Sequence, residues 1–191
     1  MVVLDGASGV GKTHTLRGLQ KAWPRVRQGP LLDVGLDRAL DAFGPRTLPR
    51  WWDLIQRCDP PPPAAPARVS WGPLGRELVT GLHQVAATWA RTGFDVVLEH
   101  VLLDRTTAND LGRALADLPV LHVGLICDED VLEAREAERR RRTLGLAVAQ
   151  QRQTADVAER HVLLDTTMAT TEELVEELLA AVGERFGLEV R

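Results

Sequence analysis

The first residues with chemical meaning are 6–13, which read GASGVGKT and fit the pattern G-x-x-x-x-G-K-[ST]. In this pattern backbone N–H groups cradle a phosphate chain, the lysine reaches its terminal phosphates, and the last hydroxyl ligates Mg²⁺. Lys12 and Thr13 take these two side-chain roles. The backbone contacts come from Gly6, Ala7, Ser8, Gly9, Val10 and Gly11. The stretch predicts a nucleotide site in a strand-loop-helix setting.

The base of the nucleotide is indicated by a missing motif. Guanine-specific switch proteins usually carry N/T-K-x-D, and the only lysines of this chain are Lys12 and Lys21. The sequence therefore favours ATP over GTP, with Mg²⁺ as the accompanying metal ion.

Two acids follow predicted strands. Asp37 comes just after residues 31–35, and Glu99 ends the run 94–99. Ligands of open parallel sheets bind outside the carboxyl ends of the strands, so both acids are site candidates. Asp37 could accept the proton of an attacking hydroxyl, or it could only cap a helix. Glu99 would join Thr13 at the metal, and the neighbouring His100 would either contact a substrate or be a hydrogen-bonded histidine without a chemical role.

A charged helix carries Arg135, Arg139 and Arg142, spaced four and three residues apart and hence on one face. Such a face is usually solvated. In a phosphate-loop enzyme the alternative is a lid over residues 128–153, whose arginines close over the phosphates and stabilise the charge that is transferred.

Strand-like and helix-like runs alternate along the chain. Strands are expected at residues 2–4, 31–35, 94–99, 119–126 and 161–164. Helices are expected at residues 12–23, 36–43, 73–91, 109–117, 128–142, 143–153 and 171–186. This order predicts a single three-layer α/β domain over residues 1–191, with a five-stranded parallel sheet and a helical lid. Residues 45–70 lose periodicity and contain a proline-rich run at 60–66, so they are expected to form an excursion near the substrate.

Composition narrows the class of partner. The formal net charge is −4, from 23 basic and 27 acidic residues, which argues against a protein that coats nucleic acid. No apolar run is long enough to span a bilayer, and no leader precedes the glycine loop, so a cytoplasmic protein is expected. Cys58 and Cys127 form no metal-binding or disulfide pattern. No signature of an oligomeric interface is visible.

Together these segments resemble the chloramphenicol phosphotransferase family, which are small phosphate-loop kinases that inactivate an antibiotic by phosphorylating a hydroxyl. The similar stretches are the glycine loop, residues 35–37, 70–73 with Arg76, 96–101, 127–145 and 165–167. The resemblance implies that Asp37 is the general base, that Lys12 binds phosphate, and that Arg135, Arg139 and Arg142 belong to a lid.

The sequence departs from the family in two places. Glu99-His100 stands where the family tends to have two aspartates, and Ala155 and Arg160-His161 replace a family His and Tyr-Asp pair. The reaction class should survive these changes, whereas the acceptor could differ.

The predicted function is ATP-dependent transfer of the γ-phosphoryl group to a hydroxyl of a small molecule, foremost an antibiotic such as chloramphenicol. Phe43, Trp52 and Trp71 could stack on this acceptor or pack the excursion onto the body. One alternative is a metabolic or sugar-nucleotide kinase of the shikimate or zeta-toxin type, which would need basic residues for an anionic acceptor. Another is a nucleotide-dependent drug-binding protein that transfers nothing.

Overall fold

A parallel sheet forms the centre of the protein, as the sequence predicted. The computed structural model describes residues 1–44, 47, 50–58, 68–138 and 145–190. Within them, five strands pair in the order β2-β5-β1-β6-β7, and every pair is parallel. The strands are β1 (Val2–Asp5), β2 (Leu31–Gly35), β5 (Asp95–His100), β6 (Leu121–Ile126) and β7 (Val162–Asp165).

The register of the central strands determines which side chains meet at the carboxyl edge. β1 is buried along its whole length, because helices cover both faces of the sheet. Glu99 on β5 lies opposite Leu4 on one side and Gly35 on the other, and His100 lies opposite Asp5. The phosphate loop, which follows β1, and the residues after β2 therefore flank Glu99.

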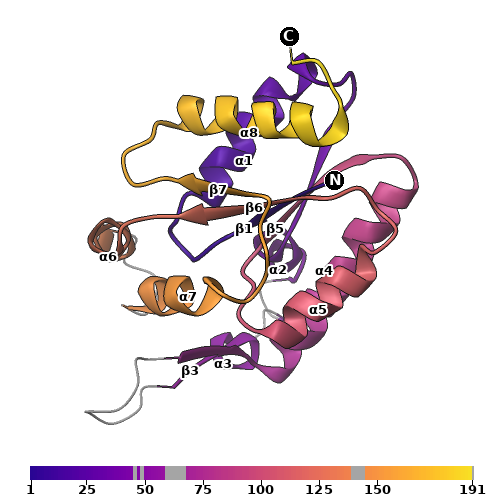
Figure 1. The fold of residues 1–191 in the computed structure, drawn as a ribbon. Helices are drawn as coiled ribbons and strands as arrows, with labels where there is room; N and C mark the ends of the chain where they lie inside the picture. The colour runs from indigo at the N-terminus through magenta and orange to yellow at the C-terminus, as the bar shows by residue number, and fades with distance from the viewer. Residues whose placement is uncertain (45–46, 48–49, 59–67, 139–144, 191) are drawn as a thin grey trace.

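Helices cover the two faces of the sheet (Figure 1). On one face α1 (Lys12–Ala22), which runs into the 3-10 turn η1 (Trp23–Arg25), packs against α8 (Thr171–Phe186). Their apolar stripes meet the sheet in a core that includes Leu16, Leu19, Leu178 and Leu179. On the other face α4 (Pro73–Arg91) packs against α5 (Arg105–Ala114) over a second core, which includes Ala86, Ala87, Val96 and Leu98.

Capping side chains determine where two of these helices begin. The Thr170 hydroxyl accepts from Glu173 N–H, and the Glu173 carboxylate accepts from Thr170 N–H, which is a capping box at the start of α8. Asp104 accepts from Thr107 N–H and caps α5. The predicted start of this helix at residue 109 is therefore wrong by four residues. The prediction followed the periodicity of apolar side chains, and a polar capping residue lies outside that pattern.

The segment predicted to be an aperiodic excursion contains regular structure. It holds α3 (Trp51–Leu54) and an antiparallel pair, β3 (Ile55–Cys58) and β4 (Arg68–Trp71), while residues 59–67, with the proline run, lie outside the described residues. Val69 and Trp71 point inward and alternate with exposed neighbours. At Gly75 a Cβ atom would lie 2.0 Å from the Leu54 carbonyl oxygen, so glycine allows α3 to pack on α4.

Three shorter helices stand at the carboxyl edge of the sheet. α2 (Leu36–Asp41) begins directly after β2, and α6 (Glu129–Glu138) and α7 (Leu146–Thr154) occupy the predicted lid region. Figure 1 shows α6 beyond the ends of β6 and β7. Among the described residues, no helix combines the length and apolar character that a bilayer span needs.

Candidate active site

A cavity at the carboxyl ends of β1, β5 and β2 brings most of the predicted site residues together. The phosphate loop forms its floor and α2, β4 and α7 form its walls. Its lining includes Ser8, Gly9, Gly11, Lys12, Thr13, Asp37, Trp71, Glu99, His100 and Gln150. Segments far apart in the sequence thus meet around one space.

The phosphate loop has the backbone that phosphate binding needs. Gly9 and Gly11 adopt positive φ angles of 86° and 109°, a region that other residues rarely occupy. Helix α1 starts at Lys12, so its first N–H groups, which lack partners within the helix, lie at the loop. Lys12 Nζ donates to the carbonyl oxygens of Gly6 and Ala7, at 2.8 and 2.9 Å, and is held over the loop.

Gln150 is a residue of this site that the sequence did not reveal. Its Oε1 accepts a hydrogen bond from Ser8 N–H at 2.8 Å, and the side chain is buried. A neighbouring glutamine of α7, Gln151, both accepts from Cys127 N–H and donates to the Cys127 carbonyl. The only local signal is a run of glutamines after four apolar residues in a short helix. Helix α7 is therefore bonded to the phosphate loop and to the end of β6.

Thr13 and Glu99 form an oxygen pair suited to Mg²⁺. Thr13 Oγ1 donates to Glu99 Oε1 at 3.3 Å. Magnesium is usually held by one or two protein oxygens together with phosphate oxygens and water, so this pair fits the ion. Among the described residues, no group of three or more His, Cys, Asp or Glu side chains forms a metal cage. Burial raises the pKa of Glu99, the Lys12 ammonium opposes that shift, and the charge of Asp37 adds to it.

Asp37 stands in the first turn of α2 and lines the same cavity as Lys12 and Glu99. The N-cap position of α2 is Gly35, so Asp37 lies two residues inside the helix and is not its N-cap residue. The sequence left two roles open for Asp37, which were to cap the helix or to accept a proton from an attacking hydroxyl. Asp37 shares the cavity with the phosphate loop, so its carboxylate is within the site and remains a candidate proton acceptor.

His100 is bonded to residues that lie behind the cavity wall. Its Nε2 is 2.7 Å from His83 Nε2, and His83 Nδ1 is 2.7 Å from Asp110 Oδ2. Both histidines are buried. Burial lowers the pKa of His100 to about 3, and the adjacent His83 contributes to this shift. The hydrogen-bonded histidine that the sequence allowed for is present, and it also lines the cavity.

Much of the cavity lining outside the loop is apolar. A third hydrophobic core joins α2, α3, the β3-β4 pair, α4 and α7, and it includes Leu54, Ile55, Val69, Trp71 and Leu146. Of the three aromatic residues predicted to contact an acceptor, Trp71 lines the cavity, whereas Phe43 and Trp52 are not among its lining residues. Trp52 is 61% exposed.

A second hollow lies on the other side of the loop glycines. Gly9, Gly11, His14, Thr15, Arg135 and Thr166 line it. Arg135 donates to the Thr166 carbonyl oxygen at 2.7 Å and to its hydroxyl at 3.2 Å, so the guanidinium is anchored at this edge. The other two predicted lid arginines, Arg139 and Arg142, lie outside the described residues.

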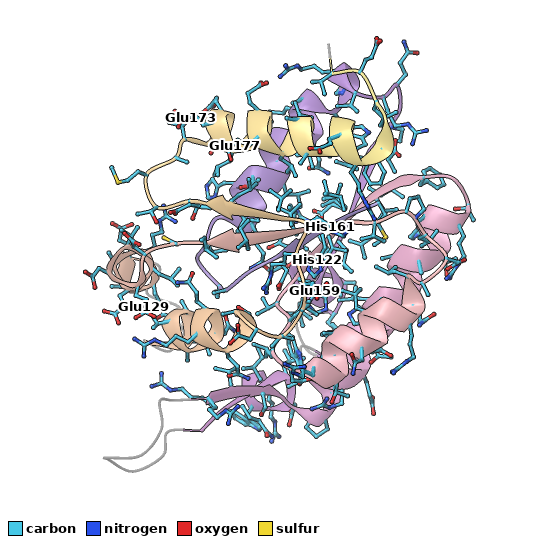
Figure 2. All side chains as sticks on the ribbon, in the orientation of Figure 1. His122, Glu129, Glu159, His161, Glu173 and Glu177 are labelled. Atoms are coloured by element: carbon cyan, nitrogen blue, oxygen red, sulfur yellow. The ribbon has the colours of Figure 1, made fainter. Side chains whose placement is uncertain are left out.

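Helices α6 and α7 are joined by ionic contacts. Figure 2 shows Glu129 at the start of α6, where its Oε1 accepts from Arg152 Nε of α7 at 2.6 Å. The buried Glu136 accepts from the N–H groups of Gly145 and Ala147, and so caps α7. The lid region is thus a bonded pair of helices.

The departure from the family at Arg160-His161 lies outside the cavity. Arg160 forms an ion pair with the buried Asp5 and donates to the Ala155 carbonyl oxygen. His161 Nδ1 accepts from His122 N–H at 3.0 Å, and Figure 2 shows both histidines near the start of β7. The side chains at this departure therefore contact Asp5 and the backbone of His122, whereas Glu99 and His100 line the cavity.

Several solved structures resemble this fold. A sugar kinase from Janibacter sp. HTCC2649 aligns with a TM-score of 0.62 at 18% identity, covering 95% of this chain and 92% of that one. A tunicamycin resistance protein from Deinococcus radiodurans aligns at 0.63 and 19%, covering 95% of both chains. The Mycobacterium tuberculosis APS kinase, in complex with AMPPNP and APS, aligns at 0.61 and 14%, covering 95% and 96%. The fold is that of the P-loop kinases.

The family comparison agrees with the resemblance seen in the sequence. No curated protein matched this chain. A family model described as chloramphenicol phosphotransferase-like protein matches residues 1–183. Together with the fold, this match supports a small-molecule kinase. The chain belongs to the chloramphenicol phosphotransferase-like family.

Proposed function

We propose that this protein transfers the γ-phosphoryl group of ATP to a hydroxyl group of a neutral, partly apolar small molecule. One observation carries the proposal: a single cavity holds the phosphate loop, the Thr13-Glu99 oxygen pair and Asp37, and most of its other lining residues are apolar. Phosphate binding, a metal site and a proton acceptor are the parts that phosphoryl transfer to an alcohol requires.

In the proposed reaction the acceptor oxygen attacks the γ-phosphorus, the bond from that phosphorus to the β-γ bridging oxygen breaks, and ADP leaves. Asp37 accepts the hydroxyl proton as the new bond forms. Lys12 and the N–H groups of the loop neutralise charge on the phosphates. Thr13 and Glu99 would hold Mg²⁺, which supplies further neutralisation of phosphate charge. Arg135 would contact the nucleotide from the second hollow.

The lining of the cavity favours an uncharged acceptor. Among the described residues that line it, Lys12 is the only lysine or arginine, and this residue belongs to the phosphate loop. An anionic acceptor would need a further cation, as the alternative of a shikimate-type kinase requires. Leu36, Leu40 and Ile55 line the cavity beside Trp71, which suits an apolar or aromatic ring. An antibiotic such as chloramphenicol is the acceptor that we propose to test first.

The experiment is incubation with Mg·ATP and a panel of hydroxylated antibiotics, sugars and anionic metabolites, with mass spectrometry to detect an added phosphoryl group. We expect product from chloramphenicol or another neutral member. In Asp37→Asn, kcat should fall at least about a hundredfold, because the proton acceptor is lost. Asp41→Asn is the matched control, since Asp41 lies on the same helix and is exposed.

The outcomes separate the three candidate functions. Product from the anionic metabolites alone would favour the metabolic kinase. Binding of chloramphenicol that Asp37→Asn leaves intact, with no product from any member of the panel, would favour a drug-binding protein. Transfer by Asp37→Asn at the rate of the unaltered protein would refute the proposed role of this carboxylate.

A further inference from the structure

A cavity remote from the phosphate loop lies beside α5. Its walls come from α5, from the residues that lead into β6, from the segment that joins α7 to β7, and from the end of α8. None of its lining residues also lines the active-site cavity or the second hollow. This space, which we call the α5 cavity, is therefore not explained by the proposed transfer reaction.

The floor of the α5 cavity is aliphatic. It is formed by Val3, Leu102, Leu111, Leu115, Leu118 and Val120. All six belong to the core between the sheet and helices α4 and α5, or pack against it. Gly112 also lines the cavity, and a Cβ atom at this position would meet none of the surrounding atoms within 4 Å. The helix thus leaves open space beside an apolar floor, which suits an apolar group of a ligand.

Arg185 is the cation of this cavity. Its Nε donates to the Val120 carbonyl oxygen at 2.9 Å, so the guanidinium is held at a residue of the floor. Arg185 is exposed, and it forms no ion pair with any described residue. Its two terminal nitrogens are therefore available to donate side by side to both oxygens of a carboxylate.

The rest of the lining carries no negative charge. Among the described residues that line the α5 cavity, none is an aspartate or a glutamate. Its other polar side chains belong to His122 and His161, and a histidine is neutral or positive. The two residues lie side by side (Figure 2), because His161 Nδ1 accepts from His122 N–H. The charge of the lining thus favours an anion over a cation.

We propose that the α5 cavity binds a small amphipathic carboxylate, with its apolar chain on the aliphatic floor and its carboxylate at Arg185. An alcohol with the same chain would keep the apolar contacts and lose the ion pair. An ammonium ion with that chain would meet Arg185 as a like charge. The inference does not depend on the proposed function, because the site needs neither a nucleotide nor a hydroxyl acceptor.

The ligand class is tested on the unaltered protein without nucleotide, with octanoate, octan-1-ol and octylammonium as probes. Calorimetry gives the affinities, and NMR of leucine and valine methyl groups locates the probe. We expect octanoate to bind about fivefold or more tightly than octan-1-ol, and octylammonium to bind most weakly. Methyl shifts should appear at Leu111, Leu115 and Leu118 rather than at Leu36 and Leu40, which line the active-site cavity.

Three results of this titration would overturn the inference. One is the absence of octanoate binding at concentrations up to about 10 mM. The second is a set of methyl shifts confined to Leu36 and Leu40, which would place octanoate in the active-site cavity. The third is equal affinity for the three probes, which would show that the charge of the ligand is not recognised.

The position of the apolar chain is tested by Gly112→Leu. The new side chain would occupy the open space beside the floor, so Kd for octanoate should rise about tenfold or more. Gly81→Leu is the matched control. Gly81 is likewise an exposed helical glycine whose Cβ atom would meet none of the surrounding atoms within 4 Å, and it lies outside the α5 cavity. Equal octanoate affinities of the two variants would contradict the proposed position.

The role of the cation is tested by Arg185→Gln. Kd for octanoate should rise about tenfold, because a charge-assisted pair is lost, while Kd for octan-1-ol should change little. This difference between the probes separates the loss of the charge from a general loss of structure. Arg105→Gln is the control, because Arg105 is exposed on α5 and lies outside the cavity. If Arg185→Gln binds octanoate as tightly as the unaltered protein does, Arg185 does not hold the carboxylate and the inference is wrong.

Discussion

Gln150 of α7 accepts a hydrogen bond from the backbone N–H of Ser8 at 2.8 Å, and this bond joins the lid region directly to the phosphate loop. The two residues are 142 positions apart in the chain. The bond occupies the N–H group of Ser8, a backbone donor that the sequence predicted to contact phosphate. The conformation of the loop depends on α7 as well as on its own glycines.

Replacement of Gln150 should therefore weaken nucleotide binding. In Gln150→Leu the Ser8 N–H would be buried without an acceptor, which costs about 1–3 kcal/mol. We expect a lower free energy of unfolding and a Kd for AMPPNP that is about tenfold higher, measured by urea unfolding and calorimetry. Gln151→Leu is the matched variant, because Gln151 bonds Cys127 rather than the loop. Equal nucleotide affinities of the two variants would contradict this role of Gln150.

The buried ion pair of Asp5 with Arg160 should contribute strongly to stability when only one partner is removed. Asp5 is fully buried and also accepts from Leu102 N–H at 2.9 Å. Arg160→Met would leave its carboxylate unpaired, at a cost of about 3–5 kcal/mol in urea unfolding. Arg25→Met, which breaks an exposed pair with Glu176, should have little effect. Similar losses of unfolding free energy in the two variants would show that the burial of Asp5 does not increase the contribution of its ion pair to stability.

Acid should destabilise the protein through its buried histidines. Burial lowers the pKa of His83, His100 and His122, and that of His100 to about 3. Below about pH 6.5 the unfolded chain binds protons that the folded rings do not, so stability falls as the pH falls. We expect a loss of about 1.4 kcal/mol per pH unit for each ring that stays neutral, measured by urea unfolding between about pH 6.5 and 4.5. The slope should be shallower in His100→Gln, and an unchanged slope would exclude His100 as a contributor.

Because of Glu99, the rate of phosphoryl transfer should depend on pH and on the concentration of magnesium. Its pKa is raised by burial, so the carboxyl group gains a proton at a higher pH than an exposed glutamate does. Metal binding needs the ionised form, and kcat/KM should therefore begin to fall at a higher pH than an ordinary carboxylate would give. Glu99→Gln should raise the Mg²⁺ concentration for half-maximal rate about tenfold or more, since one carboxylate ligand is lost. An unchanged magnesium requirement would remove Glu99 from the metal site.

Several features were predictable because their signals are local. The residue types that specify an element lie within a few neighbouring positions in three cases. These are the glycine loop, the strands formed by apolar runs, and the helix that begins after Gly72-Pro73. Asp37 and Glu99 were predicted near the phosphate loop because both follow strands, whose carboxyl ends lie at one edge of a parallel sheet, and both line the cavity there. The β3-β4 pair was missed because its strands are separated by residues 59–67, and pairing between them is not visible in either strand alone.

The sequence by itself determined the phosphate-loop motif and the family of this chain, because both depend on residue types at fixed spacing. Only the tertiary structure decided which residues surround the phosphate loop and its cavity. Gln150 on the loop, Trp71 in the cavity wall and the chain from Asp110 through His83 to His100 each join elements that are remote in sequence. Contacts of this kind arise when helices bury their apolar faces against the sheet, so they leave no periodic or local trace.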